Sequence, residues 1–398
     1  MKPIKIAEDI YWVGAVDWNI RDFHGYSTFQ GTTYNAYLIL DEKVTLIDTV
    51  KKEFADEALE TISEIIDPKK IDIVISNHTE MDHSGGLPRF MHKIGENKPV
   101  YCSKMGQKAL SAHFKPKLNY QPVENGGELS IGKRTLTFLE TRMVHWPDSM
   151  FTYAKEDKIL FSSDGFGQHY AGVERFDDEI GDAIIPHAAK YFANILLLYS
   201  PLILKLIDSV KKMGLEISTI CPDHGVMWRK DPGKIIGLYE EWSLQKPKNK
   251  ALVIYDTMWH STQAMAEAIV DGLGKEGVDA RARHLRAWHR SDIMTDVLDA
   301  GAIIVGSPTL NNGLFPTVAD FLTYMKGLKP QNKLGAAFGS YGWSGEAVKL
   351  IKNELEEMKF EMIDDGLRVQ YVPAQDTIKA CYDLAKKIAK RLVEVTGG

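Results

Sequence analysis

Four side chains that can bind metal ions, His78, Glu80, Asp82 and His83, lie within six positions of one another. They directly follow the apolar run 71–76, which predicts a buried strand, and they precede a Gly-Gly turn. Two imidazoles and two carboxylates held this close lose hydration, and the carboxylates repel each other, unless a cation compensates them. The spacing therefore predicts a metal site on a loop at the end of a strand.

Three further candidate ligands, His145, Asp164 and His224, lie farther along the chain. Each follows an apolar or β-branched run and comes shortly before Gly or Pro, which indicates a loop after a strand. Alone, either histidine would more commonly be a hydrogen-bonded structural residue, and Asp164 a turn residue. Together with the compact motif, they complete a set of seven side chains that suits two metals with one bridging carboxylate.

The carboxylate at position 80 bears on which metal the site prefers. Zinc prefers imidazole and thiolate ligands, whereas an added carboxylate shifts the preference of a site toward iron or manganese. On ligand type, the set favours two irons over two zincs. Its members are His78, Glu80, Asp82, His83, His145, Asp164 and His224.

A loop rich in hydroxyl side chains links the first strand of the second half, residues 251–255, to its first helix. Backbone amides at a helix N-terminus, together with hydroxyls, can hold a phosphate. No Gly-x-Gly-x-x-Gly pattern is present, so a monophosphate is a more suitable ligand for this loop than a dinucleotide. The loop residues concerned are Thr257, Met258, Trp259, His260, Ser261 and Thr262.

Two more loops follow later strands of this half and contain glycines that let the backbone approach a flat ring. One such loop is a common βα turn, but three at one sheet edge predict FMN binding, with Tyr341 or Trp343 stacked on the ring. The flavin also strengthens the preference for iron. The residues concerned are Ser307, Pro308, Thr309, Leu310, Asn311, Ser340, Tyr341, Gly342, Trp343 and Ser344.

The elements that position these residues have a different pattern in each half. The first half is strand-rich and then mixed: the runs 34–40, 44–48 and 120–161 predict strands, with a hairpin turn at 124–127. The segment 188–213 predicts one long helix, bent or broken at Pro201. A polar segment at 246–250 predicts a linker between the halves.

The second half alternates strands with helices. Near-continuous apolar strands at 251–255, 302–305 and 334–338 are typical of a parallel sheet covered on both faces. Helical periodicity covers 263–275, 316–326, 346–358 and 374–395. This order predicts an α/β doubly wound domain of the flavodoxin-like kind.

Composition excludes several other classes of protein. The 398 residues include 48 Lys and Arg against 54 Asp and Glu, a net charge of −6, which argues against a general nucleic-acid binder. No run approaches the roughly 18 apolar residues that cross a bilayer, and no signal-peptide core follows Met1. Three isolated cysteines cannot form a disulfide framework. We expect a cytoplasmic protein with no nucleic-acid or membrane partner.

The metal motif resembles that of the metallo-β-lactamase superfamily over residues 1–245. In the zinc hydrolases of that superfamily the motif is His-x-His-x-Asp-His, and Glu80 stands where the second His would be. With a flavodoxin-like half after it, the chain resembles the flavodiiron proteins over essentially its whole length. The resemblance implies an N-terminal αββα sandwich at 1–245, a linker at 246–250 and an FMN domain at 251–398.

The resemblance also implies a role for each candidate ligand. His78, Glu80 and His145 match the ligands of one non-haem iron, and Asp82, His83 and His224 match those of the other. Asp164 matches the carboxylate that bridges the two irons. Members of the family differ in whether the residue that matches His83 is bonded.

Flavodiiron proteins reduce dioxygen to water, nitric oxide to nitrous oxide, or both. The resemblance implies a cytoplasmic homo-oligomer, either a head-to-tail dimer or a dimer of dimers, and a rubredoxin or a reduced deazaflavin as electron donor. His24 and Tyr191 resemble polar residues of the substrate pocket, and His169 is a third candidate, although each is also compatible with a surface or core position.

Two other functions are compatible with the sequence alone. One is a dinuclear metallo-hydrolase with a flavodoxin-like module, and the other is an electron carrier tethered to a structural metal domain. Reducing one dioxygen to two waters takes four electrons, which a di-ferrous pair and a reduced flavin together supply. A hydrolase has no use for the flavin, so the combination favours the reductase.

Overall fold

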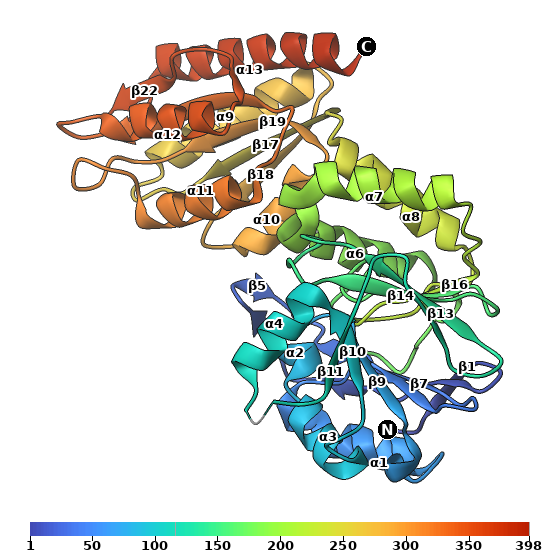
Figure 1. Cartoon of the computed structure of the whole chain (residues 1–398). Coiled ribbons are helices and arrows are strands. Elements are labelled where there is room, and N and C mark those ends of the chain that lie inside the picture. The colour runs from blue at the N-terminus through green and yellow to red at the C-terminus, as the bar shows by residue number, and fades with distance from the viewer. Residues whose placement is uncertain (116, 398) are drawn as a thin grey trace. The chain divides into compact units, whose positions relative to one another are not determined.

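The computed structural model describes residues 1–115 and 117–397, so Gly398 at the end of the second predicted domain lies outside it. The chain forms two compact units (Figure 1). The first comprises residues 1–24, 28–191 and 201–240, and the second comprises residues 25–27, 192–200 and 241 onward. Two short segments from the first half of the sequence thus belong to the second unit.

The first unit contains a seven-stranded sheet in the order β1-β2-β7-β8-β9-β10-β11. The strands β7 to β9 come from the apolar runs that predicted them, and β8 to β11 are parallel neighbours. Their carboxyl ends therefore lie at one edge, where the metal motif follows β9. The bounds are β1 Ile4–Ala7, β2 Ile10–Trp12, β7 Tyr37–Ile39, β8 Thr45–Ile47, β9 Ile73–Ser76, β10 Val100–Ser103 and β11 Tyr120–Val123.

A second sheet of the same unit has five strands in the order β12-β13-β14-β15-β16. Its strands are antiparallel except for the parallel pair β15–β16, whose ends carry Asp164 and His224. The predicted hairpin at 124–127 is wrong, because this turn connects β11 of the first sheet to β12 of the second. The bounds are β12 Glu128–Ser130, β13 Thr135–Glu140, β14 Met150–Ala154, β15 Ile159–Phe161 and β16 Thr219–Cys221.

The two sheets enclose one hydrophobic core, in which Trp12 and Ile47 of the first sheet join Phe138 and Phe161 of the second. A further core lies between the first sheet and α1 (Ala55–Ser63), α3 (Leu87–Ile94) and α4 (Lys104–His113). Helices α7 (Ser200–Met213) and α8 (Pro232–Leu244) lie against β14 and β15 of the second. These four layers confirm the predicted αββα sandwich.

The predicted long helix at 188–213 is interrupted well before Pro201. Helix α6 (Ile185–Tyr191) passes into a π-helical turn at Phe192–Leu196 and a 3-10 turn at Leu197–Tyr199, and then α7 begins. Pro201 lies in the first turn of α7, where its missing N–H has no partner to lose. The wider helical stretch Asp177–Met213, which starts with α5 (Asp177–Ile180), is long and apolar enough to cross a membrane by composition alone. A helix in a protein core passes the same test, so this is weak evidence for a membrane span.

The second unit contains a parallel sheet in the order β18-β17-β19-β20-β21, with β22 also paired to β20. The order in which the chain adds strands reverses between β17 and β19, although all the strands stay parallel, and this confirms the predicted doubly wound fold. Residues 248–250, expected in the linker, belong to β17. The bounds are β17 Lys248–Tyr255, β18 Asp279–His284, β19 Ala300–Gly306, β20 Leu334–Tyr341, β21 Glu361–Met362 and β22 Leu367–Gln370.

The helices of this unit cover both faces of the sheet. Residues of α9 and α13 share one core with Val253 and Ile304. Right-handed crossovers put the helices that follow β18, β19 and β20 on the opposite face. The bounds are α9 Ser261–Lys275, α10 Arg290–Val297, α11 Pro316–Leu328, α12 Glu346–Glu357 and α13 Gln375–Thr396.

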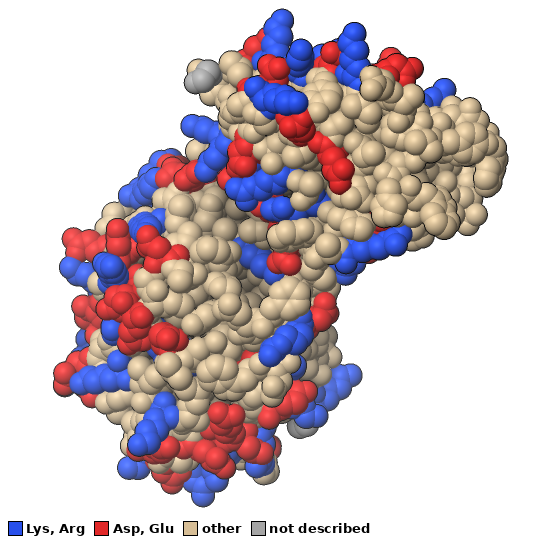
Figure 2. Space-filling model, turned by 180° about the vertical axis from the view of Figure 1, so that it is seen from behind, with Lys and Arg blue, Asp and Glu red and all other residues tan. Residues whose placement is uncertain are grey.

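The described chain also contains several short elements. They are β3 Ala15–Asp17, β4 Asp22–Phe23, β5 Tyr26–Ser27, β6 Thr32–Tyr34 and the single turn α2 Met81–Ser84. Figure 2 shows basic side chains mixed with acidic ones on the face that it presents. That distribution agrees with the charge balance of the sequence.

Candidate metal centre and flavin cavity

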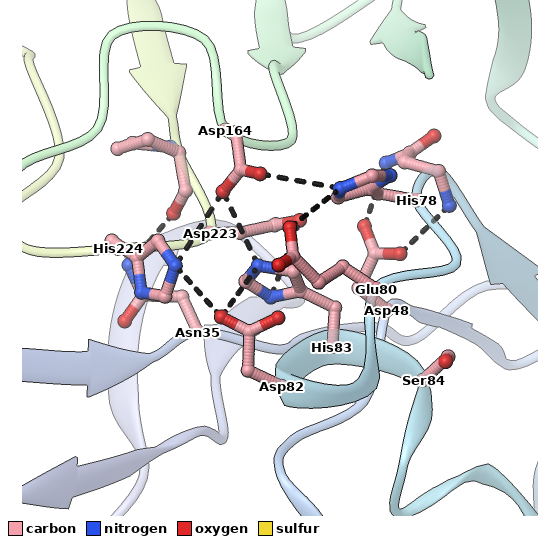
Figure 3. A network of polar contacts seen from close by, with 12 residues as sticks. Asn35, Asp48, His78, Glu80, Asp82, His83, Ser84, Asp164, Asp223 and His224 are labelled. Atoms are coloured by element: carbon pink, nitrogen blue, oxygen red, sulfur yellow. Dashed lines mark hydrogen bonds and ion pairs between the residues drawn. The ribbon is translucent and has the colours of Figure 1, made fainter. Parts of the chain in front are cut away.

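All seven predicted metal ligands come together at one edge of the sandwich, and Figure 3 labels all of them except His145. Glu80, Asp82 and His83 lie in or beside α2, the turn that follows β9. His145 lies between β13 and β14, while Asp164 and His224 follow the parallel neighbours β15 and β16. Both sheets therefore contribute loops to one cluster.

The cluster divides into two groups of possible ligands. His78, Glu80, His145 and Asp164 offer atoms that all lie within 4.8 Å of one another, and so do Asp82, His83 and His224. Within the first group, His145 Nε2 is 3.2 Å from Glu80 Oε2. Within the second, His224 Nε2 is 3.1 Å from Asp82 Oδ2.

The carboxylate of Asp164 lies between the two groups. Its Oδ2 atom is 2.8 Å from His145 Nε2 and 3.4 Å from His78 Nε2. Its Oδ1 atom is 3.2 Å from His83 Nε2 and 3.5 Å from His224 Nε2. One oxygen thus faces each group, which is the arrangement a bridging carboxylate needs.

Several donor atoms of this cluster have no hydrogen-bond partner in the described part of the protein and are suited to binding metal ions. Both carboxylate oxygens of Asp82, Oδ1 of Asp164 and both ring nitrogens of His83 are buried and have no hydrogen-bond partner among the described residues. Buried polar atoms without partners are costly, and three carboxylates in one buried cluster repel one another. Cations bound between the two groups would satisfy these atoms.

The electrostatic field inside the cluster favours positive charge. Burial would lower the pKa of His78, but hydrogen bonds to Asp148 and Glu80 hold it well above its usual value. Burial likewise opposes the charged form of His83, yet Asp82 and Asp164 raise its pKa. The carboxylates surrounding these rings therefore stabilise a cation at the centre of the cluster.

Several groups that support the ligands were not predicted as functional from the sequence. Asp148 Oδ2 is 3.1 Å from His78 Nδ1 and accepts a hydrogen bond from the backbone N–H of Thr79 at 2.7 Å. The backbone carbonyl of Thr33 accepts from His224 Nδ1 at 2.6 Å. Metal-binding histidines commonly donate their second N–H to a carboxylate. A supporting role for Asp148 could therefore have been predicted from its place in the sequence, three residues after His145.

A pocket of about 370 Å³ opens beside the cluster, and Glu80 and Asp82 form part of its wall. His24, one of the predicted pocket residues, lines it and lies with Nε2 3.5 Å from Glu80 Oε1. The complete lining is Ile20, Asp22, Phe23, His24, Lys51, Lys52, Glu53, Glu80, Met81 and Asp82.

The other two predicted pocket residues lie behind the ligands and outside this lining. Tyr191 is buried, and burial together with the nearby Asp164 carboxylate raises the pKa of its hydroxyl well above the usual value. His169 Nδ1 lies 2.8 Å from Thr32 Oγ1, and its ring packs against the His224 ring at 4.8 Å. Burial and His224 lower the pKa of His169, so this ring stays neutral.

The three predicted flavin loops surround a cavity of about 480 Å³ at the carboxyl edge of the second unit's sheet. Twelve of the sixteen predicted residues line it, including Tyr341 and Trp343. The sequence did not indicate Asn312, nor Tyr371 and Val372 after β22. The lining is Met258, Trp259, Ser261, Pro308, Thr309, Leu310, Asn311, Asn312, Ser340, Tyr341, Gly342, Trp343, Ser344, Tyr371 and Val372.

Of the four predicted residues outside this lining, Thr262 and Ser307 connect parts of the loops to one another. Thr262 Oγ1 is 2.9 Å from Ser340 Oγ, which ties the start of α9 to the end of β20. Ser307 Oγ accepts the N–H of Phe315. His260 adopts a left-handed conformation, with φ of 67°, directly before α9. Thr257 Oγ1 is buried with no partner among the described residues, which suits a phosphate ligand.

Comparison with known proteins covers both units. A sequence profile for the ODP family beta lactamase matches residues 32–225, and one for flavodoxin matches residues 253–392. The chain is 47% identical over 398 residues to the nitric oxide reductase of Moorella thermoacetica, a match that covers 99% of this chain and 100% of that protein.

Two solved structures match the whole fold. The rubredoxin oxygen:oxidoreductase of Desulfovibrio gigas superposes with a TM-score of 0.98 and 44% identity, covering 100% of both chains. The flavodiiron protein of Giardia intestinalis superposes with a TM-score of 0.96 and 37% identity, covering 100% of this chain and 98% of that one.

Proposed function

Because the chain belongs to the flavodiiron protein family, we propose that it is an oxidoreductase that reduces dioxygen to water, nitric oxide to nitrous oxide, or both. Two of the relatives bear the names of these activities, nitric oxide reductase and rubredoxin oxygen:oxidoreductase. A dinuclear hydrolase is not favoured, because the named relatives are oxidoreductases and the flavodoxin half has no part in hydrolysis.

The position of Asp164 carries the proposal. Its two oxygens face two separate groups of nitrogen and oxygen donors, so one carboxylate can bridge two metal ions. A dinuclear centre suits the two-electron chemistry of a diatomic gas better than a single ion does. The flavodoxin unit of the same chain supports FMN as the second redox group.

The seven side chains would hold two non-haem irons, with His78, Glu80 and His145 on one, Asp82, His83 and His224 on the other and Asp164 between them. Three carboxylates among the seven ligands favour iron over zinc. When bound, the irons and FMN supply the electrons that reduce the gas. The chain's own residues position these groups and supply protons.

Tyr191 holds a proton close to the cluster. Burial and the nearby Asp164 carboxylate raise its pKa well above the usual value, so the hydroxyl keeps its proton across the physiological range. His24 lies beside Glu80 with three-quarters of its side chain exposed, so solvent reaches its ring. We propose both as proton-supplying residues, and His169 as a neutral ring that supports His224.

The flavin loops divide the binding of FMN between them. Thr257 and the N-terminus of α9 would hold the phosphate, and the Tyr341 and Trp343 rings would flank the flavin within the cavity. The remaining cavity residues lie on the turns at the same edge of the sheet. Recognition of the ring therefore depends on the shape of three loops.

The partners and location are part of the same proposal. We infer a rubredoxin or a reduced deazaflavin as the electron donor, since one relative is named for rubredoxin. We further propose a cytoplasmic homo-oligomer, a head-to-tail dimer or a dimer of dimers. The division of the chain into a metal-binding domain before residue 246 and a flavin-binding domain from residue 251 also remains a proposal.

Gas reduction by the fully reduced protein tests the function directly. Protein prepared without oxygen and reduced through rubredoxin should consume dioxygen with water as product, or nitric oxide with nitrous oxide as product. Running both gases side by side gives the preference between them. Release of hydrogen peroxide as the main product would instead indicate bare flavin chemistry and contradict the proposal.

A further inference from the structure

A pair of buried atoms beside the second group of ligands has no hydrogen bond. Neither His83 Nδ1 nor Asp223 Oδ2 has a partner among the described residues, and both side chains are about 1% exposed. The two atoms are 3.7 Å apart, slightly beyond hydrogen-bonding distance. An N–H donor and a carboxylate acceptor left unpaired at this depth are costly, so their proximity is informative.

The backbone fixes both residues where they face each other. The Thr49 hydroxyl donates to the carbonyl of His83, which anchors the α2 turn. The Asp223 N–H donates to the Ser163 carbonyl at 2.7 Å, and the Asp223 carbonyl accepts the Asn35 N–H at 2.8 Å. A small side-chain adjustment is therefore enough to bring Nδ1 and Oδ2 within hydrogen-bonding distance.

The opposite edge of the His83 ring faces the candidate metal centre (Figure 3). Its Nε2 atom is 3.2 Å from Asp164 Oδ1 and 3.4 Å from Asp82 Oδ2. If Nε2 binds a metal, the neutral ring carries its proton on Nδ1. That proton then points toward Asp223.

No other buried carboxylate in the described part of this centre is equally free for the role. Asp48 already accepts from the backbone N–H and the side-chain amide of Asn77, at 2.7 and 2.8 Å. Asp148 lies against His78 of the other group. The His78–Asp148 pair thus shows, within this centre, the arrangement that His83 and Asp223 nearly form.

We propose that Asp223 is a positioning residue that accepts the Nδ1 proton of His83 and so holds Nε2 as a ligand of the second metal ion. This inference rests on the proposed di-iron function. Asp223 then determines whether His83 is bonded to the metal. Without an acceptor at this position, no polar contact keeps the ring from rotating away from the metal.

Two substitutions of Asp223 separate this role from general structural damage. Asp223→Asn keeps an acceptor oxygen at the same reach, whereas Asp223→Ser is small and polar but too short to reach Nδ1. We expect the serine variant to lose affinity for the second ferrous ion by about 10–100-fold, the usual effect of removing such a partner. X-ray absorption should show one histidine fewer on that ion. The asparagine variant should stay within a few-fold of the unaltered protein.

A matched variant of the other carboxylate serves as control. Asp148→Ser should alter the Mössbauer signal of the iron held by His78, and Asp223→Ser that of the iron held by His83. Unchanged affinity and an unchanged histidine count in Asp223→Ser would overturn the proposal. If unaltered protein binds no iron at all, the proposed function fails instead.

A measurement on the unaltered protein decides the matter if the serine variant does not fold. In the di-ferrous protein, the Nδ1 proton of a bonded His83 should give a hyperfine-shifted NMR signal. Burial and the bond to Asp223 should make that signal exchange slowly with solvent. A di-ferrous protein in which this signal is absent or exchanges at once would contradict the proposal.

Discussion

The metal centre in the first unit and the flavin cavity in the second differ in how much of each site is buried. Asp82, His83 and Asp164 are at most 4% exposed, whereas Trp259 and Trp343 at the flavin cavity are each 88% exposed. The metal centre uses charged side chains from both sheets, and the flavin cavity uses three turns at the edge of one sheet. The first site therefore depends on individual charges and the second on the shape of its loops.

This contrast predicts how each site responds to the loss of one side chain. Removal of one member of a buried charged cluster leaves its partners uncompensated, which is costly. Removal of one contact from an open cavity leaves the other contacts in place. Single substitutions should therefore have large effects at the metal centre and small ones at the flavin cavity.

The largest effect is expected for Asp164→Ala, which removes the proposed bridge. Iron affinity should fall by far more than the roughly 100-fold limit of an outer-shell change, and gas reduction should fall to background. FMN should be retained, because no residue of its cavity is altered. Iron per chain by mass spectrometry and flavin by absorbance measure the two outcomes. Asp182→Ala, at an exposed position of the same unit, is the matched control. Near-normal iron in Asp164→Ala would exclude the bridging role.

Glu80→His should change the identity of the metal more than the amount bound. The substitution restores the His-x-His-x-Asp-His pattern, so the site should favour zinc when both metals are supplied during growth. Reductase turnover should be abolished, because zinc has no redox chemistry. Metal analysis and turnover on the same preparation check this prediction. Full iron content with full activity would show that Glu80 does not select the metal.

Trp343→Ala should weaken FMN binding by only about 2–10-fold, which corresponds to an aromatic contact of roughly 0.5–1.5 kcal/mol. Iron content should not change. Fluorescence titration of the flavin-free protein with FMN measures the effect. Trp288→Ala, at an exposed tryptophan outside the cavity lining, is the control. A loss as large as that caused by removing a metal ligand would contradict the contrast between the sites.

A change in stability, and not in either site, is expected from a buried charge in the second unit. Burial lowers the pKa of Lys333 to about 7, and its ammonium donates to the carbonyls of Leu298 and Ala300. Between pH 7 and about 10.5 the unfolded lysine holds a proton that the folded one has lost. Stability should therefore rise with pH in this range, by at most about 1.4 kcal/mol per pH unit.

Lys333→Met tests this by removing the titrating group. The unfolding free energy of the unaltered protein should rise relative to that of the variant as the pH rises from 7 to about 10. Denaturant unfolding at several pH values measures it. A difference that does not change with pH would show that Lys333 has the same pKa in both states.

The metal ligands could be predicted from the sequence because their types and loop positions are local. His78, Glu80 and His83 lie within one short motif, and Asp164 and His224 each follow a short apolar strand. Parallel strands end at a common edge, so such loops meet in space. The αββα sandwich and the doubly wound sheet follow from strand patterns of the same local kind.

Other features depend on packing between distant segments and could not be predicted. Asp223 lies beside His83 only because the α2 turn and the loop after β16 meet, across 140 positions of sequence. The turn at 124–127 has the residues of a hairpin, but it leads from one sheet to the other. The π-helical turn at Phe192–Leu196 carries no proline or glycine to mark it.

The flavin cavity was predicted only in part for a similar reason. The loops after β17, β19 and β20 follow strongly apolar strands, so their position was evident. Tyr371 and Val372 follow β22, a short strand whose alternating residues are half exposed. Edge strands of this kind have weak sequence patterns, and the loop after one is easily missed.

An anaerobic reductive titration of the isolated, oxidised protein counts the electrons that its redox groups accept. FMN accepts two electrons and each ferric iron accepts one, so we expect four electrons per chain, with the flavin absorbance bleaching over part of the titration. A protein that takes up only two electrons, all of them into the flavin, would hold no redox-active metal pair and would contradict the account.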